Sequence, residues 1–590
     1  MAGCGGGDGA GPDAGPLPRD PAGWAALPPD QFCQAALGAV DAFLGAPGSP
    51  SEAASAHVVQ QGGLADGRSP DRPAERYGGT AVVASLQELR DGLSGFFGTH
   101  YRSAQHQLHV GLMPLVRRGP ELEPEPWLAE SWSLGEDGTS LTFVLRDDVL
   151  WHDGTPVTPA DVVFTFLRLV DERTGSPAAA FFQDYLVGEG NEPVVEGRSV
   201  TFRFRPHPEP LSPWTTLAIM PAHLLGEVDP GELRSHPYAL RCPVGNGPFV
   251  FVEHLQDQRW SFRANPVFPQ GLGGRPYLDG YVYRTVIEPS TLLTELLTGR
   301  VDLVPRLSLD QAERVEEDPE VRLLSSPGSS YLYVAWNSRR GVLSDPRVRQ
   351  ALALSMDRPG ILAGIRGGRG VLAPTGIPPS HPAWIPAPPE FDLHDPQRAG
   401  ELLDAAGWTR QESGAVRRNQ AGEPLTLTLL HDAANQEQGD IALRIQATLA
   451  QVGVEVELRS LEFGTLLSRA ESAGRDFDAL IMSSQPDFRI DESPVFHSRY
   501  REEGPYAWSG IADPELDLLL DSLAVTGDPA GNRGLWARYQ ERIRDLQPYT
   551  WLYFPDWLTG VRSHLQGVTV DPRGEWTAIR DWWIPGEERR

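Results

Sequence analysis

The apolar and polar residues of this chain alternate with periods that predict both helices and hairpins. Within residues 28–45, Phe32, Ala36, Val40 and Phe43 recur at the spacing of one helical face. Residues 131–151 alternate apolar and polar positions on either side of a glycine turn, which predicts a β-hairpin. Residues 158–172 begin with a threonine cap and a proline and continue with a helical apolar stripe, so we expect a helix there.

Further along the chain, strand and helix patterns alternate. Residues 281–304 predict a strand, a helix and a short strand, and residues 424–461 predict a strand, a long amphipathic helix and a second strand. Such β-α-β units build open α/β sheets, which bind ligands in crevices at the strand ends. We therefore expect an α/β fold with a ligand crevice.

The length of 590 residues requires at least two lobes, because a single core stops growing at roughly 250 to 300 residues. Residues 1–76 are rich in Gly, Ala, Pro and Ser, which predicts a tether with one docked helix and regular structure from Tyr77 onward. No apolar run is long enough to span a membrane.

Charge and composition exclude several classes of function. The formal net charge of −28 disfavours binding to nucleic acids and to anionic membrane surfaces. The sequence contains no lysine, which excludes a P-loop lysine and a lysine Schiff base. It also contains no GxSxG nucleophile motif, and His106 and His109 have no further metal ligand nearby in the sequence. An enzyme is therefore not expected, and no cofactor is predicted.

The three cysteines leave more than one interpretation open. Cys4 follows Ala-Gly and precedes a Gly-rich segment, like the end of a bacterial lipoprotein signal, although Met1 stands where leucine is usual. An accidental cysteine in an unstructured leader is the alternative. Outside the cytoplasm Cys33 and Cys242 are free to form a disulfide, and their positions in the sequence do not decide whether they do.

The order of motifs resembles family 5 of the solute-binding proteins, the oligopeptide, dipeptide and nickel receptors of ABC importers. Residues 125–166, EPWLAESWSLGEDGTSLTFVLRDDVLWHDGTPVTPADVVFTF, are similar to the signature region of that family. The resemblance continues through residues 244–268, 292–304, 345–358 and 558–583, and it covers the chain from Tyr77 to Trp583. These strings are mostly structural, so they point to the fold more strongly than to the ligand.

The resemblance implies a type II periplasmic-binding-protein-like fold with two lobes, a hinged cleft and an inserted domain. After the tether and N-terminal extension (1–76), it implies a discontinuous domain I, an inserted domain II and a domain III. It also implies hinge crossings near residues 268–274 and 549–554. The implied extents are 77–121, 205–270 and 556–590 for domain I, 122–204 for domain II and 271–555 for domain III.

The same resemblance suggests which residues hold the ligand. Aligning Phe477 and Asp478 with the family pattern places Asp487 where peptide receptors keep a carboxylate for the ligand ammonium. Ser484 stands where the family has tryptophan, and a second alignment through residues 496–498 shifts this role to Asp491. Asn246 lies in the segment that matches a cleft-facing glycine turn of the family.

The sixteen tryptophans supply a second kind of candidate, because some aromatic rings are expected to line the cleft. Trp336 and Trp508 are the two that we predict there.

The predicted function is an extracytoplasmic receptor, periplasmic or on the cell surface and anchored through Cys4, that delivers peptides or peptide-like solutes to an ABC permease. We expect a monomer that binds no nucleic acid. A metal chelate or a sugar as ligand is the alternative, and a borrowed scaffold acting as sensor or enzyme is a third possibility.

Overall fold

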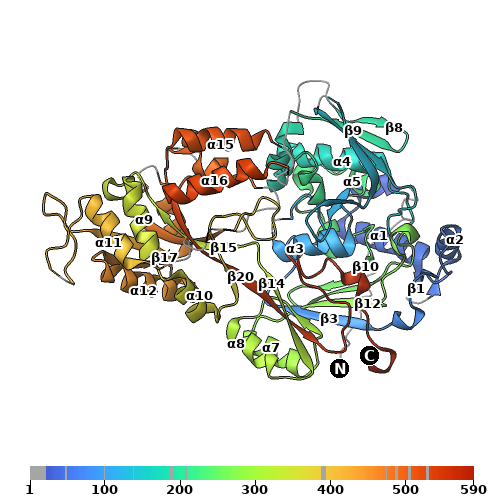
Figure 1. The fold of residues 1–590 in the computed structure, drawn as a ribbon. Coiled ribbons are helices and arrows are strands. Elements are labelled where there is room, and N and C mark those ends of the chain that lie inside the picture. Colours follow the sequence, from blue (N-terminus) through green and yellow to red (C-terminus); the bar gives the residue numbers. More distant parts are fainter. Residues whose placement is uncertain are drawn as a thin grey trace, which may run out of the picture.

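A computed structural model describes most of the chain and divides it into two lobes (Figure 1). The described residues are 21–46, 49–98, 100–136, 138–185, 192–205, 209–386, 388, 394–412, 414–472, 475–484, 490–502, 506–526 and 531–589. Within these ranges no helix is both long enough and apolar enough to cross a membrane.

One continuous sheet runs through both lobes, and β20 (Tyr549–Arg562) is the strand that they share. The C-terminal part of β20 pairs with β13 and β14 in the first lobe, and its N-terminal part pairs with β15 and β16 in the second. The first-lobe strands, in sheet order, are β10 (Phe249–Leu255), β11 (Arg259–Ala264), β12 (Gly280–Thr285), β3 (Thr80–Ser85) and β13 (Leu303–Val304), with β14 (Val321–Pro327) beside β20. The second-lobe strands are β15 (Tyr331–Trp336), β19 (Ala479–Ser484), β17 (Thr426–Asp432) and β18 (Glu455–Leu461), with β16 (Gly370–Leu372) beside β20.

The chain crosses between the lobes at residues 327–331 and again at about residue 555. The first crossing joins β14 to β15, and the second lies inside β20, where Pro555 pairs with Gly370. The crossing predicted at 268–274 is wrong, because β12, β13 and β14 still pair with first-lobe strands. The implied boundary of domain III at residue 271 therefore does not match the strand pairing. The second crossing lies directly after the predicted segment 549–554.

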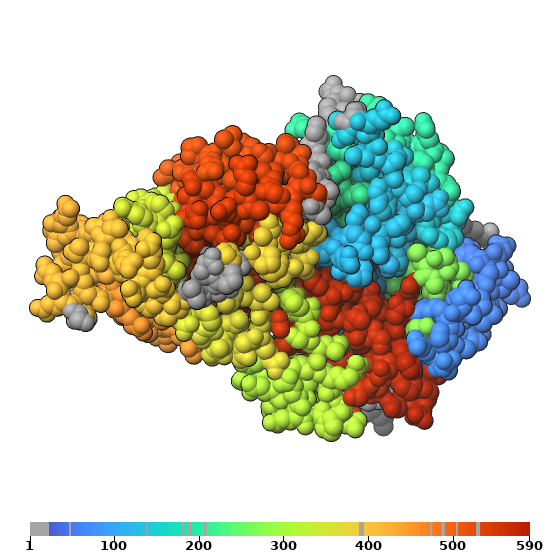
Figure 2. Space-filling view, viewed as in Figure 1, coloured from blue at the N-terminus to red at the C-terminus, as the bar shows by residue number. Residues whose placement is uncertain are grey.

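Helices cover both parts of the sheet. The first lobe carries α3 (Tyr101–His106), α4 (Pro159–Val170), α5 (Ala222–Leu225), α6 (Tyr238–Arg241), α7 (Pro289–Leu297) and α8 (Leu309–Glu316). The second lobe carries α9 (Pro346–Ser355), α10 (Arg358–Arg366), α11 (Pro396–Ala405), α12 (Gln436–Gln451), α13 (Phe463–Glu471), α14 (Ser493–Phe496), α15 (Pro514–Ala524) and α16 (Arg533–Leu546). The C-terminal residues, dark red in Figure 2, return to the first lobe and lie beside residues near position 300.

A separate four-stranded antiparallel sheet lies within residues 129–203, inside the range that the resemblance implies for the inserted domain. Its strand order is β6-β7-β9-β8, and the predicted hairpin is formed by β6 and β7. The predicted helix is α4, where Thr158 and Asp161 form a capping box. The strands are β6 (Ala129–Leu134), β7 (Ser140–Leu145), β8 (Val194–Glu196) and β9 (Ser199–Arg203), and a small ribbon of β4 (Val116–Arg118) and β5 (Pro124–Pro126) precedes them.

The N-terminal extension is docked on the first lobe from Pro21 onward, earlier than the predicted start of structure at Tyr77. Helix α1 (Pro29–Leu44) buries Phe32, Ala36 and Val40, as its apolar face predicts. It is followed by β1 (Gly45–Ala46), β2 (Ser49–Pro50) and α2 (Glu52–Gln60). Cys33 and Cys242 form a disulfide that ties α1 to the segment after α6, which resolves the pairing that the sequence left open.

Candidate functional site

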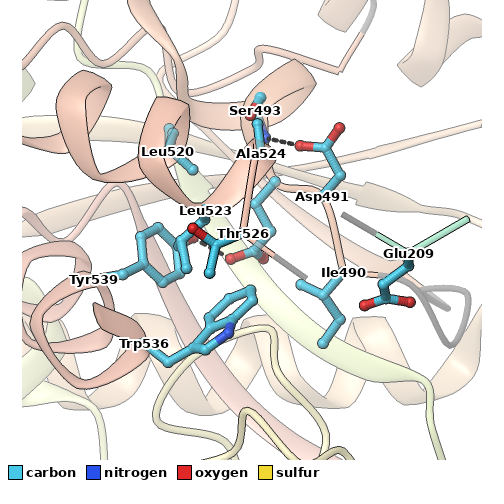
Figure 3. Close-up of a pocket in the computed structure, with 11 residues that line it drawn as sticks. Glu209, Ile490, Asp491, Ser493, Leu520, Leu523, Ala524, Thr526, Trp536 and Tyr539 are labelled. Carbon is cyan, nitrogen blue, oxygen red and sulfur yellow. Dashed lines mark hydrogen bonds between the residues drawn. The ribbon is translucent and has the colours of Figure 1, made fainter. Parts of the chain in front are cut away.

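A pocket at the meeting point of the two lobes is the best candidate for a functional site. The side chains around it come from four segments of the chain (Figure 3). Glu209 belongs to the first lobe, and the other three segments belong to the second lobe. The lining residues are Glu209, Ile490, Asp491, Glu492, Ser493, Leu520, Leu523, Ala524, Thr526, Trp536 and Tyr539. Because both lobes supply lining residues, movement of one lobe would change the pocket.

Helices α15 and α16 form the apolar floor. Asp513 caps α15 by accepting a hydrogen bond from the Leu516 N–H group at 2.8 Å, and this fixes the start of the helix below the pocket. On α16, Trp536 and Tyr539 are three residues apart and therefore share one helical face. Both side chains are buried in the second-lobe core, together with Leu520 of α15. The floor is thus a rigid part of that core.

Glu492 is the half-buried carboxylate at the centre of the pocket wall. The Tyr539 hydroxyl donates a short hydrogen bond to Glu492 Oε2. A side chain at Gly376 would place its Cβ 2.7 Å from Glu492 Oε1, so glycine leaves room for this carboxylate. Burial raises the pKa of Glu492, the Tyr539 hydrogen bond acts in the opposite direction, and the charge of Asp491 adds to the rise, so that the resulting pKa is about 7.

The pocket therefore combines negative charge with apolar surface. Glu209, Asp491 and Glu492 bring three carboxyl groups around one space, and the described lining includes no arginine or histidine. A cationic group would pair with these carboxylates, and an adjacent apolar group would fit against Trp536 and Leu523. The site is suited to an amine with an apolar neighbour.

Of the predicted ligand residues, Asp491 is the one that the structure places in this pocket. Its Oδ1 accepts a hydrogen bond from the Ser493 N–H group at 3.0 Å, at the start of α14 (Figure 3). This contact orients the carboxylate at the rim, which it shares with Glu209 of the other lobe. Asp487 and Cys4 lie outside the described residues.

The two predicted tryptophans are in the core and not in the pocket. Successive side chains of β15 point to opposite faces of the sheet, so Trp336 joins the cluster with Leu332 and Val334. Its indole Nε1 donates to Thr550 Oγ1 at 2.9 Å, which satisfies the buried donor. Trp508 is 6% exposed and stacks on Tyr333 behind the pocket, with 6.4 Å between the ring centroids.

Asn246 is buried in the first lobe, away from the pocket lining. Its exposed fraction is 1%, and its backbone N–H group donates to the Gly111 carbonyl. Neither polar atom of its side-chain amide has a hydrogen-bond partner among the described residues. The structure therefore does not bring Asn246, Trp336, Trp508 and Asp491 together in one site.

Of the two histidines considered in the sequence, His106 is part of the first-lobe packing and His109 is half-buried. Histidine 106 is buried and its ring bonds to the Arg102 carbonyl and the Tyr281 hydroxyl. Burial lowers the pKa of His106 to about 3. In the part of the chain that the structure describes, no three His, Cys, Asp or Glu side chains are grouped so that they could hold a metal ion.

Sequence reasoning missed most of the pocket. Glu492 is next to a predicted residue, and its proximity in the sequence was the available signal. Trp536 and Tyr539 form an i, i+3 pair of aromatic residues in the sequence, but such pairs mostly indicate core. Glu209 gave no signal, because it comes from the other lobe and almost three hundred residues earlier in the chain.

The overall architecture and the interlobe pocket define a two-lobed solute-binding protein. The model of the bacterial extracellular solute-binding proteins, family 5, matches residues 123–505, which is more than half of the chain. The chain belongs to this family.

Individual relatives agree with this assignment. The chain is 26% identical over 528 residues to the oligopeptide-binding protein AppA of Bacillus subtilis, covering 88% of this chain and 93% of AppA. It is 27% identical over 480 residues to the probable di/tripeptide-binding protein 5 of Pseudomonas aeruginosa, covering 76% and 85% of the two chains.

Solved structures share the fold. AppA from Bacillus subtilis in complex with a nonapeptide has a TM-score of 0.67 and 24% identity, over 86% of this chain and 99% of AppA. NikA from Brucella suis in complex with Fe(III)-EDTA has a TM-score of 0.73 and 21% identity, over 86% and 99% of the two chains. The type II periplasmic-binding-protein-like architecture expected from the sequence is therefore confirmed.

Proposed function

We propose that this protein is the extracytoplasmic receptor of an ABC importer and that it captures peptides or peptide-like solutes between its lobes for delivery to a membrane permease. Family membership and the similarity to AppA and to the di/tripeptide-binding protein support this proposal. The protein acts by binding and release and has no catalytic activity of its own.

The observation that carries the peptide proposal is the acidic pocket between the lobes. A peptide offers an ammonium group next to an apolar side chain, which is the combination that Asp491, Glu492 and the Trp536 floor accommodate. Because Glu209 belongs to the other lobe, the ligand gains its full set of contacts only when both lobes meet around it. Capture would then be coupled to closure.

The test is peptide binding by Asp491→Ala. Loss of one partner of a desolvated, charge-assisted hydrogen bond costs about 2 to 5 kcal/mol, so affinity for an amine-bearing peptide falls about thirtyfold or more. Isothermal titration with a mixed-sequence nonapeptide library, with free or acetylated N-termini, measures this loss. The acetylated library, which lacks the ammonium, should bind the variant and the parent protein equally.

Two control variants accompany this experiment. Asp318→Ala removes a similar side-chain acceptor, since Asp318 accepts the Glu320 N–H group at 2.9 Å, and it should leave binding unchanged. Asp487→Ala tests the alternative alignment. If Asp491→Ala and Asp487→Ala both bind the free-amine library as tightly as the parent, the pocket does not recognise an ammonium group, and a metal chelate or a sugar becomes the better ligand.

Anchoring through Cys4 is part of the same proposal and rests on the Ala-Gly-Cys string followed by a Gly-rich sequence. One acyl chain binds membranes only marginally, so stable anchoring needs the several chains of a bacterial lipoprotein. Expressed behind a complete signal peptide, the protein should partition into detergent, and Cys4→Ser should abolish this. Equal partitioning of both forms would contradict the proposal. The receptor is expected to act as a monomer.

A further inference from the structure

A cluster of charged and aromatic side chains lies at the base of the first lobe, outside the acidic pocket. At its centre is Glu575, whose exposed fraction is 0%. Arg306 Nε donates to Glu575 Oε1 at 3.0 Å, and the Tyr101 hydroxyl donates to Oε2 at 2.8 Å. Arg102 Nη1 lies 3.4 Å from Glu575 Oε1 on the other side. Two guanidinium groups thus share one carboxylate.

This cluster has one positive charge more than it has negative charge. Glu575 is the one carboxylate that the structure records in contact with Arg102 and Arg306, among the described residues. Burial of an unbalanced charge is costly, so the excess has to face either solvent or an anion. Arg102 is buried, whereas the side chain of Arg306 is 28% exposed, so the excess charge is accessible at Arg306.

The Arg306 side chain is held in place like a ligand-binding group. Its guanidinium lies over the Trp557 ring at 3.4 Å from the centroid and 4.7 Å from the Tyr101 centroid. A stacked, ion-paired arginine has lost most of its rotamer freedom before any ligand arrives, so binding costs less entropy. A guanidinium has five N–H donors. Glu575 and Tyr101 are the groups recorded as its hydrogen-bond partners, so donors remain for another acceptor.

The backbone of Arg306 has a conformation that fits a functional position. Its φ angle is +60°, which is uncommon for a residue other than glycine. The residue lies two positions after the end of β13, on the carboxyl side of a parallel strand, where open α/β sheets bind ligands.

The cluster also lies at the junction of the two lobes. Trp557 follows Asp556, whose N–H group donates to the Arg369 carbonyl of the second lobe. One residue earlier, Pro555 pairs with Gly370 of β16. Arg306, which lies over Trp557, therefore stands beside the second crossing between the lobes.

From this geometry we infer that Arg306, backed by Trp557, Tyr101 and Glu575, is a binding site for a carboxylate of the transported ligand. This inference rests on the proposed function. The ligand would then have two ends of opposite charge, because the acidic pocket binds a cationic group and Arg306 binds an anionic group. A planar guanidinium fits a carboxylate through two parallel N–H···O bonds, which lysine is unable to form.

The experiment compares three nonapeptide libraries that lack internal Asp and Glu, titrated into the purified full chain. The first has free C-terminal carboxylates, the second has C-terminal amides, and the third has amides with a single internal Asp. The parent should bind the first at least about tenfold more tightly than the second. If the amide library with an internal Asp binds as tightly as the free-acid library, the site accepts a side-chain carboxylate. If it binds only as tightly as the plain amide library, the site requires the terminal carboxylate.

The variants then assign the preference to Arg306. Arg306→Gln should lose about tenfold or more in affinity for the free-acid library and nothing for the amide library, which removes the preference. Arg306→Lys keeps the positive charge and should retain only part of the preference for the free-acid library. Arg284→Gln is the matched control, because Arg284 belongs to the same lobe, has a 35% exposed side chain and pairs with Glu295 at 2.8 Å. It should keep the full preference.

The outcomes separate this inference from the proposed function. If the parent binds none of the three libraries, peptide capture itself is wrong. If the parent and Arg306→Gln both bind the free-acid and amide libraries with equal affinity, peptide capture stands and the carboxylate site is wrong. If Arg306→Gln is too unstable to purify, the comparison of Arg306→Lys with the parent decides in the same way.

Discussion

The two lobes each contain a carboxylate next to a tyrosine hydroxyl, half-buried at Glu492 and fully buried at Glu575, and the pKa values of the two groups move in opposite directions. Burial raises the pKa of Glu492 to about 7, and the lining residues that the structure describes include no arginine or histidine that would oppose this rise. Burial also acts to raise the pKa of Glu575, but Arg102 and Arg306 outweigh it and hold the pKa below its usual value. A glutamate in the second lobe therefore has no cationic side chain beside it among the described lining residues, whereas a glutamate in the first lobe is paired with two arginines.

The comparison shows how a ligand can complete each site. Glu492 has no arginine or histidine beside it among the described lining residues, whereas Glu575 has two guanidinium groups, of which that of Arg306 remains partly exposed. A solute with a positive and a negative group would satisfy both, and the two lobes would hold its two ends. The following changes test this contrast.

The largest effect is expected from Glu575→Gln. The amide keeps the shape of the side chain but leaves Arg102 and Arg306 as two like charges without a carboxylate, at a cost of about 3 to 5 kcal/mol. Urea unfolding followed by tryptophan fluorescence measures the loss. Glu492→Gln is the matched control, because it removes a carboxylate that lacks a cation and should not destabilise the protein. Equal effects of the two substitutions would contradict the contrast.

A somewhat smaller effect is expected when the disulfide of the first lobe is removed. Cys33→Ser with Cys242→Ser opens a link between residues 209 positions apart, and loss of a native disulfide typically costs about 2 to 5 kcal/mol. The loss should appear in urea unfolding of the double variant and, for the parent, after addition of a reductant. Because Glu492 belongs to the other lobe, its titration should be unaltered. A changed Glu492 titration in the double variant would show that the sites are not independent.

The smallest effect is the pH dependence that Glu492 contributes. Its pKa is about 7 in the folded protein and 4.5 when unperturbed, so the folded state binds this proton more tightly. The contribution to stability is complete below pH 4.5 and is lost as the pH rises through 7. From pH 5 to 8, the parent should lose about 1 to 3 kcal/mol more unfolding free energy than Glu492→Gln, since Glu492 is partly exposed and one pKa unit is about 1.4 kcal/mol. Parallel pH profiles of the two proteins would contradict the assigned pKa.

Much of the fold was predictable because the relevant signals are local. The β6–β7 hairpin, α4 and the unit of β17, α12 and β18 all follow from periodicity and capping within about forty residues. Strand partners across the crossings were not predictable in this way. Pro555 and Asp556 interrupt the apolar residues of β20 at the crossing, but the sequence does not indicate that the two halves pair with different lobes.

The sites were less predictable than the fold, for a physical reason. Asp491 was found through the resemblance, but its neighbour Glu492 acquires its raised pKa mainly from burial in the folded protein. Arg306 is one of 51 arginines, and its role depends on Glu575 and Trp557, which lie more than 250 residues away in the sequence. Electrostatic balance is a property of the assembled structure.

The position of β20 has a consequence for how the chain is made. The first-lobe sheet needs the C-terminal half of β20 beside β13 and β14, and the buried Glu575 comes later still in the chain. During synthesis, which proceeds from the N-terminus, the lobe that begins first therefore waits for the last residues before it is complete. The second lobe also needs β20, but only its N-terminal half. The second lobe, whose synthesis begins later, is thus the first of the two lobes to have all of its strands synthesised.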